Sequence, residues 1–272
     1  MRTHKITIPG LIMLFALVVL MESCSTVPLT GRSQMSLLPE SNMVAMSLTS
    51  YDQFLDSNKV STNEQQVEMV KRAGRNISAA VEKYLTENGY ESYLQYFDWE
   101  FNLVDSEVPN AWCMPGGKVV IYTGILPLTQ SETGLAVVMG HEIAHAVARH
   151  GNERMSHSML VQMGGMALGE ALKQKPNETQ AIFSAAYGLG SQYGVMLPFS
   201  RQHEYEADKM GLIFMAMAGY NPQEAVAFWQ RMSANSGQKP PEFLSTHPVD
   251  SKRIAALNEI MPEAMRLYEA SK

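Results

Sequence analysis

Three residues in the segment 137–150, His141, Glu142 and His145, have the types and the spacing that metal-assisted hydrolysis needs. On a helix, side chains four positions apart lie on one face, about 5–6 Å apart at Cβ, so both imidazoles can reach one ion. Glu142 lies about 100° further round the helix, beside such an ion rather than bound to it. A carboxylate placed there is the expected general base for a zinc-activated water.

The same motif has a second interpretation, in which two core histidines hydrogen-bond to backbone groups. Apolar residues surround the motif on both sides, which predicts a largely buried helix in which every polar side chain needs a partner. A five-residue pattern also arises by chance, so the spacing alone does not decide between the two interpretations. A third ligand elsewhere in the chain would decide.

Candidates for the third ligand lie in the segment 201–211. Glu204 and Asp208 are four residues apart and share a helical stripe with apolar residues, whereas Glu206 points to the opposite side. Carboxylates on an apolar stripe are costly unless something compensates them. We therefore expect Glu204 to bind the metal and Asp208 to orient a histidine ligand. The alternative is a surface helix with a solvated acidic patch.

A histidine close behind the first motif is the other common solution for a third ligand. That solution requires a histidine six residues after His145, where this sequence has Gly151. His150 is one residue short, and on a continuous helix it would lie about 140° from His145. We therefore interpret His150 as structural.

The composition predicts one sizeable domain with a filled core, which we place over residues 40–272. The chain has 272 residues, is 46% hydrophobic and carries a net charge of -6. That charge, without a long basic run, argues against nucleic acid as a partner. Periodicity predicts amphipathic helices at 41–55 and 63–85, strands at 96–104 and 118–122, and a buried helix at 158–172.

The amino terminus has the pattern of an export signal. Arg2 and Lys5 precede an apolar run over 6–21, and Cys24 follows it. We expect residues 1–23 to be a signal peptide, Cys24 to be lipidated, and 24–39 to be an extended tether. The alternative is a soluble exported protein. With Cys24 lipidated, Cys113 would be the only remaining thiol, and no intramolecular disulfide could form.

The segment 109–117, with two prolines and two glycines, lies between the predicted strands. Such a composition leaves backbone groups unpaired, as at a sheet edge that accepts an extended peptide by strand addition. Asn110, Ala111 and Trp112 would then bind substrate backbone. An ordinary hairpin connection is the alternative interpretation.

Five motifs together resemble the zinc metallopeptidase family that includes the CAAX prenyl endopeptidases, the HtpX heat-shock peptidases and the mitochondrial Oma peptidases, specifically its bacterial lipoprotein branch. The motifs are 26–32 (TVPLTGR), 110–112 (NAW) with Gly116 and Gly117, 141–150 (HEIAHAVARH), 204–208 (EYEAD), and 246–248 (THP) with Arg253 and Ile254. They span almost all of the chain that follows the signal.

The resemblance implies a mostly helical α+β fold, of the zincin type with a glutamate third ligand, and a small sheet beside the helix of the histidine motif. It implies one Zn²⁺ per chain and endopeptidase activity on proteins. The substrates it suggests are misfolded or damaged envelope proteins. The expected location is the bacterial cell envelope, with the lipid anchor in the outer membrane, the protein facing the periplasm, and envelope assembly factors as further partners.

His247 precedes a proline and lies six residues before Arg253. Pro248 disfavours helix at His247 and predicts a loop that can reach over a site. His247 could occupy the open fourth position of the zinc and keep the enzyme latent, or it could donate a hydrogen bond to the tetrahedral intermediate. The alternative is a histidine that caps the helix starting near Asp250. We expect His247, and with it Arg253, to lie near the zinc.

A different functional class also fits the zinc motif, namely a periplasmic chaperone or assembly factor with a structural or latent zinc site. Glu142 discriminates between the two, because a structural site needs no base and closes its fourth position with a protein ligand. The presence of Glu142 favours the peptidase.

Overall fold

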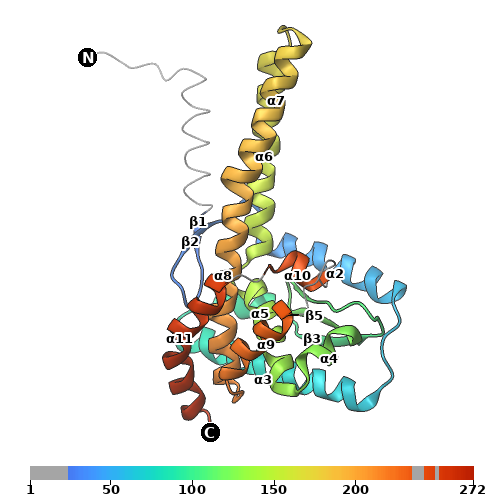
Figure 1. The fold of residues 1–272 in the computed structure, drawn as a ribbon, viewed down its shortest axis with the longest axis vertical. Coiled ribbons are helices and arrows are strands. Elements are labelled where there is room, and N and C mark those ends of the chain that lie inside the picture. The colour runs from blue at the N-terminus through green and yellow to red at the C-terminus, as the bar shows by residue number, and fades with distance from the viewer. Residues whose placement is uncertain (1–23, 235–241, 249–250) are drawn as a thin grey trace, which may run out of the picture.

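A small sheet and the helices packed on its two faces form the body of this α+β fold (Figure 1). The computed structural model describes residues 24–234, 242–248 and 251–272, so the predicted signal peptide lies outside the described residues. Most described residues are helical, which confirms the predicted fold class. The described strands are β1 (Cys24–Thr26), β2 (Ser33–Met35), β3 (Glu100–Val104), β4 (Ala111–Met114) and β5 (Lys118–Tyr122).

The central sheet has the order β3-β5-β4. β3 runs parallel to β5, with Phe101 opposite Val119, and β4 runs antiparallel to it, with Trp112 opposite Val120. β4 therefore forms one edge of the described sheet, and its outer backbone groups have no strand beside them. The strand expected over 96–104 is shorter, because Glu91–Tyr96 forms a 3₁₀ turn before it.

Both faces of the sheet are covered, so β5 is buried over most of its length. Val119 and Ile121 point into the main core, and Val120 points to the other face, against Tyr51. Trp112 lies on that second face and packs edge-on against Phe54, with ring centroids 4.9 Å apart. The alternation of a pleated strand thus divides the core between two helical layers.

Two helices of the body confirm the amphipathic helices predicted at 41–55 and 63–85. They are α2 (Glu40–Ser57) and α3 (Glu64–Glu87). Asn63 caps α3 by accepting a hydrogen bond from the backbone N–H of Gln66 at 3.2 Å, and the chain leaves the helix through Gly89 at φ 79°. The other helices are α4 (Leu126–Thr129), α5 (Glu132–Val147), α6 (His150–Leu172), α7 (Asn177–Ser191), α8 (Leu197–Met217), α9 (Gln223–Ala234), α10 (Glu242–Thr246) and α11 (Ser251–Ala270).

Two glycines bring α5 and α8 into direct backbone contact. A Cβ added at Gly140 would lie 2.9 Å from the carbonyl oxygen of Gly211, and one added at Gly211 would lie 2.8 Å from the backbone nitrogen of His141. No side chain fits between the helices at this crossing. The contact therefore fixes the helix that carries His141 against the helix that carries Glu204.

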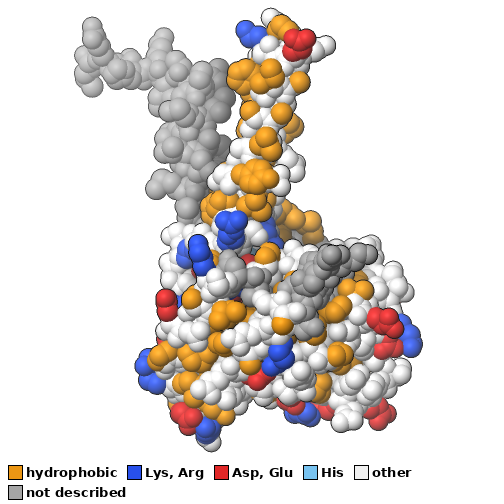
Figure 2. Space-filling view, viewed as in Figure 1, with side chains coloured by type: hydrophobic (Ala, Val, Ile, Leu, Met, Phe, Trp, Pro, Cys, Tyr) orange, Lys and Arg blue, Asp and Glu red, His pale blue; other side chains and the backbone are white. Residues whose placement is uncertain are grey.

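A long helical hairpin projects from the body (Figure 1). One arm is α6, and the other is a continuous helical run in which a π-helical turn, Gln192–Met196, joins α7 to α8. Hydrophobic side chains lie exposed along it (Figure 2). Met166 and Ile182 are each 68% exposed. The helix predicted at 158–172 is present as part of α6, but its predicted burial is wrong, because that part of α6 stands outside the core. Among the described residues, no helix combines the length and apolarity needed to span a bilayer.

The segment expected to be a tether packs on the body instead of running free. β1 and β2 form an antiparallel hairpin in which Cys24 pairs with Met35, and Val27 in its loop is fully buried. Arg32 forms ion pairs with Glu153 of α6 and Glu206 of α8. These tertiary contacts hold residues 24–35 in place beside the base of the helical hairpin (Figure 1).

Candidate active site

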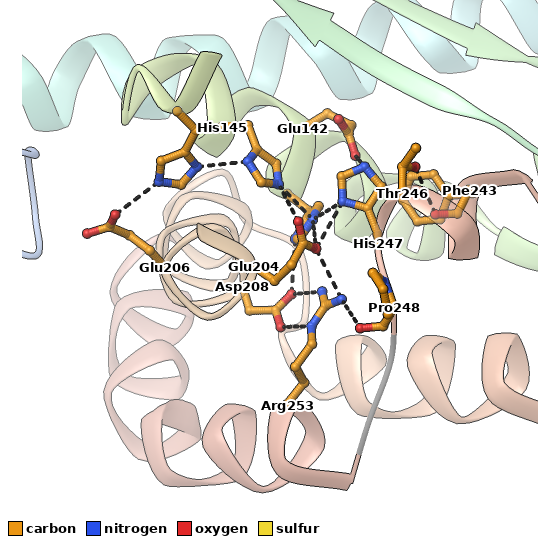
Figure 3. Close-up of polar contacts among 12 residues, drawn as sticks. Glu142, His145, Glu204, Glu206, Asp208, Phe243, Thr246, His247, Pro248 and Arg253 are labelled. Atoms are coloured by element: carbon orange, nitrogen blue, oxygen red, sulfur yellow. Dashed lines mark hydrogen bonds and ion pairs between the residues drawn. The ribbon is translucent and has the colours of Figure 1, made fainter. Parts of the chain in front are cut away.

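Four side chains from three segments converge at the centre of the molecule (Figure 3). His141 and His145 come from α5, Glu204 from α8 and His247 from the turn after α10. His141 Nε2 lies 3.1 Å from both His145 Nε2 and His247 Nδ1, and 3.3 Å from Glu204 Oε2. One donor atom from each of the four residues lies within 4.8 Å of the others, and all four side chains are buried.

The donor set fits a metal ion. Facing imidazole nitrogens and a carboxylate oxygen direct lone pairs at one point, which is unfavourable in a buried site without a shared cation. The electrostatics agree: burial lowers the pKa of His141, but the neighbouring carboxylates of Asp208 and Glu204 outweigh it and raise that pKa to about 9, so the site favours a positive charge. Nitrogen and carboxylate ligands of this kind, from two or three histidines and a glutamate, are those that zinc takes in catalytic sites.

Asp208 lies behind His141. Its Oδ1 is 3.0 Å from His141 Nδ1, although the ring N–H is not aimed squarely at that oxygen. Arg253 holds the same carboxylate with two hydrogen bonds and places Nη1 3.1 Å from Glu204 Oε2. The helical phasing of Glu204 and Asp208 is therefore as the sequence predicts, with both carboxylates facing α5.

The charges of the other groups follow from burial and from these contacts. Burial on its own would raise the pKa of Glu204, but hydrogen bonds from His141 and His247 lower it below its usual range. Burial lowers the pKa of His145 well below its usual value, and Glu204 opposes this only in part. Glu204 is thus ionised and His145 neutral, as metal binding requires, whereas His141 favours a proton that a bound metal ion would displace.

Glu142 lies beside the cluster rather than in it. Its side chain is buried, its Oε1 accepts no hydrogen bond from the described residues, and that oxygen lies 3.5 Å from His247 Nε2. Burial raises the pKa of Glu142 above its usual value. A buried carboxylate with an oxygen that accepts no hydrogen bond, next to a metal-binding cluster, is arranged to accept a proton.

His247 is held in the cluster from behind. Its ring stacks on Phe243 with centroids 4.7 Å apart, and its Nδ1 lies 2.9 Å from Glu204 Oε2. The backbone N–H of Phe243 donates to the carbonyl of Pro109, which ties α10 to the segment that leads into β4. The structure thus brings His247 together with His141, His145 and Glu204, and Arg253 lies directly behind Glu204.

His150 lies at a place that continuous helical geometry does not predict. α5 ends at Val147, and Arg149 adopts φ 56°, so the chain turns before α6 begins. That turn brings His150 Nδ1 to 2.8 Å from His145 Nδ1. The predicted separation of the two rings is wrong, because the helix does not continue from His145 to His150.

The segment 109–117 is both an edge strand and a hairpin connection. β4 starts at Ala111, and Asn110 precedes it and accepts a backbone hydrogen bond from Tyr122 at 3.1 Å. The Trp112 ring points away from α5, into the aromatic group on the second face of the sheet. The open edge of β4, rather than the Trp112 ring, is therefore the part that faces an extended ligand, although the Ala111 N–H already bonds to Asn110 Oδ1 at 2.9 Å.

The sequence matches the model of peptidase family M48 over residues 72–261, which includes all four converging residues. The chain belongs to peptidase family M48. Zinc is the metal of M48 peptidases, and the buried cluster can hold one ion.

Three relatives illustrate how this M48 chain compares with known members of the family. It is 38% identical to mitochondrial metalloendopeptidase OMA1 of Schizosaccharomyces pombe, over 64% of this chain and 50% of that protein. It is 31% identical to human OMA1, over 89% of this chain and 47% of that protein. It is 33% identical to the beta-barrel assembly-enhancing protease of Escherichia coli K12, over 58% of this chain and 33% of that protein. The chain thus spans about half the length of the OMA1 proteins that it matches.

Sequence reasoning assigned no role to the side chains behind His145. Arg32, Glu153 and His203 are all buried or nearly so, and they form a charged group with Glu206 and His150. One signal was present, since Arg32 belongs to the 26–32 motif that carried part of the family resemblance. Its partners are 121 and 174 residues away in sequence, beyond the reach of local patterns.

Proposed function

We propose that this M48 protein is a zinc endopeptidase in which His141, His145 and Glu204 hold the metal and Glu142 is the general base. The observation that carries this proposal is the buried Oε1 of Glu142, which accepts no hydrogen bond from the described residues and lies beside the ligand cluster. A purely structural zinc site has no need for such a group. The alternative function of a chaperone with a structural zinc is therefore disfavoured.

The residues would divide the reaction among them. When bound, zinc supplies Lewis-acid polarisation of the scissile carbonyl and acidifies a water molecule. Glu142 accepts the proton of that water on its carboxylate and delivers it to the leaving amine nitrogen. Asp208 holds the ring of His141, and Arg253 fixes the Asp208 carboxylate, so that the ligand geometry is kept during the reaction.

We propose that the substrate binds as an added strand along β4. The free edge of β4 supports this, because an extended peptide can pair with the backbone of 110–112 whatever its side chains are. α5 packs on the same strand, so a peptide paired there would run past the helix that carries Glu142. Binding of this kind suits unfolded or damaged proteins, the substrate class that we propose.

We further propose that His247 regulates or assists the site. Its Nδ1 lies among the ligand atoms, 3.1 Å from His141 Nε2, which supports a latent state in which His247 fills the fourth position. In an active state the same imidazole, moved aside, could donate a hydrogen bond to the tetrahedral intermediate. These two roles predict opposite effects when the ring is removed.

The decisive experiment is digestion of casein and of an unfolded envelope protein by the wild type and by Glu142→Gln. Removal of a general base should lower kcat by roughly 10²- to 10⁴-fold. Zinc content and thermal stability should be measured in both proteins, because the variant should keep its metal and its fold. Equal cleavage by both proteins would refute the assignment of Glu142, and absence of bound zinc in the wild type would refute the metal site.

We also propose that the protein is lipid-anchored through Cys24 and faces the periplasm from the outer membrane. The apolar run 6–21 before Cys24 supports export and lipidation, and the E. coli relative named for β-barrel assembly supports an envelope location and envelope assembly partners. Intact-mass measurement should find acyl chains on Cys24, and Cys24→Ala should leave an unprocessed or released product. An unmodified mature terminus at another residue would sink the lipoprotein proposal.

A further inference from the structure

A line of buried hydrogen bonds runs from the back of His145 to the amino-terminal hairpin. His145 Nδ1 lies 2.8 Å from His150 Nδ1, and His150 Nε2 lies 3.0 Å from Glu206 Oε2. Arg32 donates through Nε to the same Glu206 oxygen at 2.8 Å, and the Thr30 hydroxyl donates to the other oxygen. His150 is fully buried and Glu206 is 6% exposed, so water does not substitute for these partners.

The donors and acceptors along this line determine which nitrogen of each imidazole carries the proton when His150 is neutral. The Glu206 carboxylate only accepts, so His150 Nε2 must donate to it. In a neutral His150 the other nitrogen, Nδ1, is then an acceptor, and it takes the Nδ1–H of His145. The remaining nitrogen of His145, Nε2, is left with a free lone pair that points at His141 and Glu204. The line of bonds therefore selects the tautomer of His145 that can bind a metal.

Arg32 completes this line from outside the helical body. Its guanidinium lies between two carboxylates, with Nη1 2.8 Å and Nη2 2.7 Å from the Glu153 oxygens and Nη2 2.7 Å from Glu206 Oε2. The loop that carries it is held by the bonds Val27 N–H to Arg32 C=O at 2.8 Å and Gly31 N–H to Val27 C=O at 3.0 Å. The docked hairpin thus presents Thr30 and Arg32 in fixed positions to the carboxylate that orients His150.

We propose that the amino-terminal hairpin is a working part of the metal site, in which Arg32 and Thr30, acting through Glu206 and His150, are positioning residues for the ligand His145. This inference rests on the proposed zinc site. Because the coupling is reciprocal, zinc binding should also hold the hairpin on the body. The segment that joins the domain to the proposed membrane anchor is then linked to the occupancy of the metal site.

The first test is the zinc affinity of the full chain, measured by competition with a chromogenic chelator. Glu206→Gln and Arg32→Gln should each weaken zinc binding by roughly 10-fold, at the low end of the range for groups that orient a ligand. Glu224→Gln is the control, because it makes the same change in a carboxylate that pairs with an arginine, Arg231 at 2.6 Å, away from this line of hydrogen bonds. Its affinity should stay within about twofold of the wild type, well under the 10-fold expected for a positioning group.

His150 provides a second comparison. In His150→Gln the amide still offers an acceptor to His145 and a donor to Glu206, whereas His150→Leu offers neither. Zinc binding should be largely kept in the glutamine variant and weakened by about 10- to 100-fold in the leucine variant. If His150→Leu does not fold, the comparison of Glu206→Gln with its control still tests the inference.

The reciprocal effect gives a readout that does not depend on activity. Hydrogen exchange at the amides of residues 27–35 should be slower with zinc than without it, and Glu206→Gln should remove most of that difference. Equal zinc affinity in Glu206→Gln and Glu224→Gln, together with zinc-independent exchange in the hairpin, would overturn the inference while leaving the metal site intact. A wild type that binds no zinc would instead overturn the proposed function.

Discussion

Arg253 holds Asp208 through two parallel hydrogen bonds, Nε to Oδ2 at 2.6 Å and Nη2 to Oδ1 at 2.7 Å, in a part of the core where both residues are almost fully buried. Removing one partner from such a pair leaves an uncompensated buried charge. Arg253→Ala should therefore lower the free energy of unfolding by about 3–5 kcal/mol. Urea denaturation with zinc in excess measures this.

The control for Arg253 is Arg231→Ala. Arg231 pairs with Glu224 at 2.6 Å, but both side chains are about one quarter exposed. Solvent screening limits such a pair to about 0–1 kcal/mol. If both variants lost a similar free energy of unfolding, the buried pair of Arg253 and Asp208 would contribute no more than an exposed pair.

The assignment of the ligands can be tested by metal content. Glu204→Ala should lose zinc, because it removes a ligand, and Asp208→Ala should weaken binding by about 10- to 100-fold. Glu206→Ala should still bind one equivalent when zinc is in excess, because Glu206 touches no donor atom of the cluster directly. Mass spectrometry under native conditions measures the stoichiometry. If only Glu206→Ala emptied the site, the choice of Glu204 as third ligand would be wrong.

His247→Ala distinguishes the proposed roles of this residue by the direction of the change in rate. A latent site held by His247 predicts faster cleavage, whereas stabilisation of the tetrahedral intermediate predicts a kcat lower by roughly 10²- to 10³-fold. Initial rates on casein, normalised to bound zinc, measure the effect. Unchanged kcat and KM in a folded variant would place His247 outside the reaction.

The crossing of α5 and α8 predicts a strong effect of a single methyl group. In Gly211→Ala the new Cβ would lie 2.8 Å from backbone atoms of Gly140 and His141, which cannot move aside singly. Overpacking of this kind costs about 1–3 kcal/mol, and a shift of His141 should also weaken zinc binding. Gly188→Ala in α7 is the control, since nothing lies within 4 Å of its added Cβ. Thermal unfolding should show that variant to be as stable as the wild type or more stable, because alanine favours helix.

Acid should remove the contribution of Glu153 to stability. Burial on its own would raise the pKa of this carboxyl, but hydrogen bonds from His203 and Arg32 lower it to about 2 from an ordinary 4.5. The unfolded chain therefore binds more protons, and the stabilisation is complete above about pH 5 and is lost as the pH falls toward 2. Urea midpoints of the metal-free wild type and of Glu153→Gln should converge across this range. A difference between the two that is constant with pH would contradict the predicted shift.

Local periodicity in the sequence was sufficient to predict which candidate site residues share a helix face. His141 and His145, and likewise Glu204 and Asp208, are four residues apart on single helices, and a regular helix turns that spacing into a shared face. The run 118–122 was predicted as a strand for a similar reason, because β-branched residues follow a glycine turn.

The parts that were missed depend on non-local contacts or on an unusual backbone. The position of His150 depends on the left-handed conformation of Arg149, which a non-glycine residue rarely adopts and which no local pattern indicates. The role of Arg32 depends on two carboxylates far along the chain. The apolar segment 158–172 was predicted to be buried because hydrophobicity alone does not distinguish a core helix from an exposed apolar one.

The π-helical turn at Gln192–Met196 has a mechanical consequence for the helical hairpin. α7, this turn and α8 follow one another without a loop, so the exposed apolar arm and the helix that carries Glu204 form a single rod. A force that bends the outer end of α7 is therefore transmitted along the helix to α8, unless the helix bends at a point between them. The wide turn, whose hydrogen bonds are less regular than those of an α-helix, is the point of least stiffness along it. The turn lies between α7 and Glu204, so the helix would bend there before Glu204, the proposed metal ligand, was displaced.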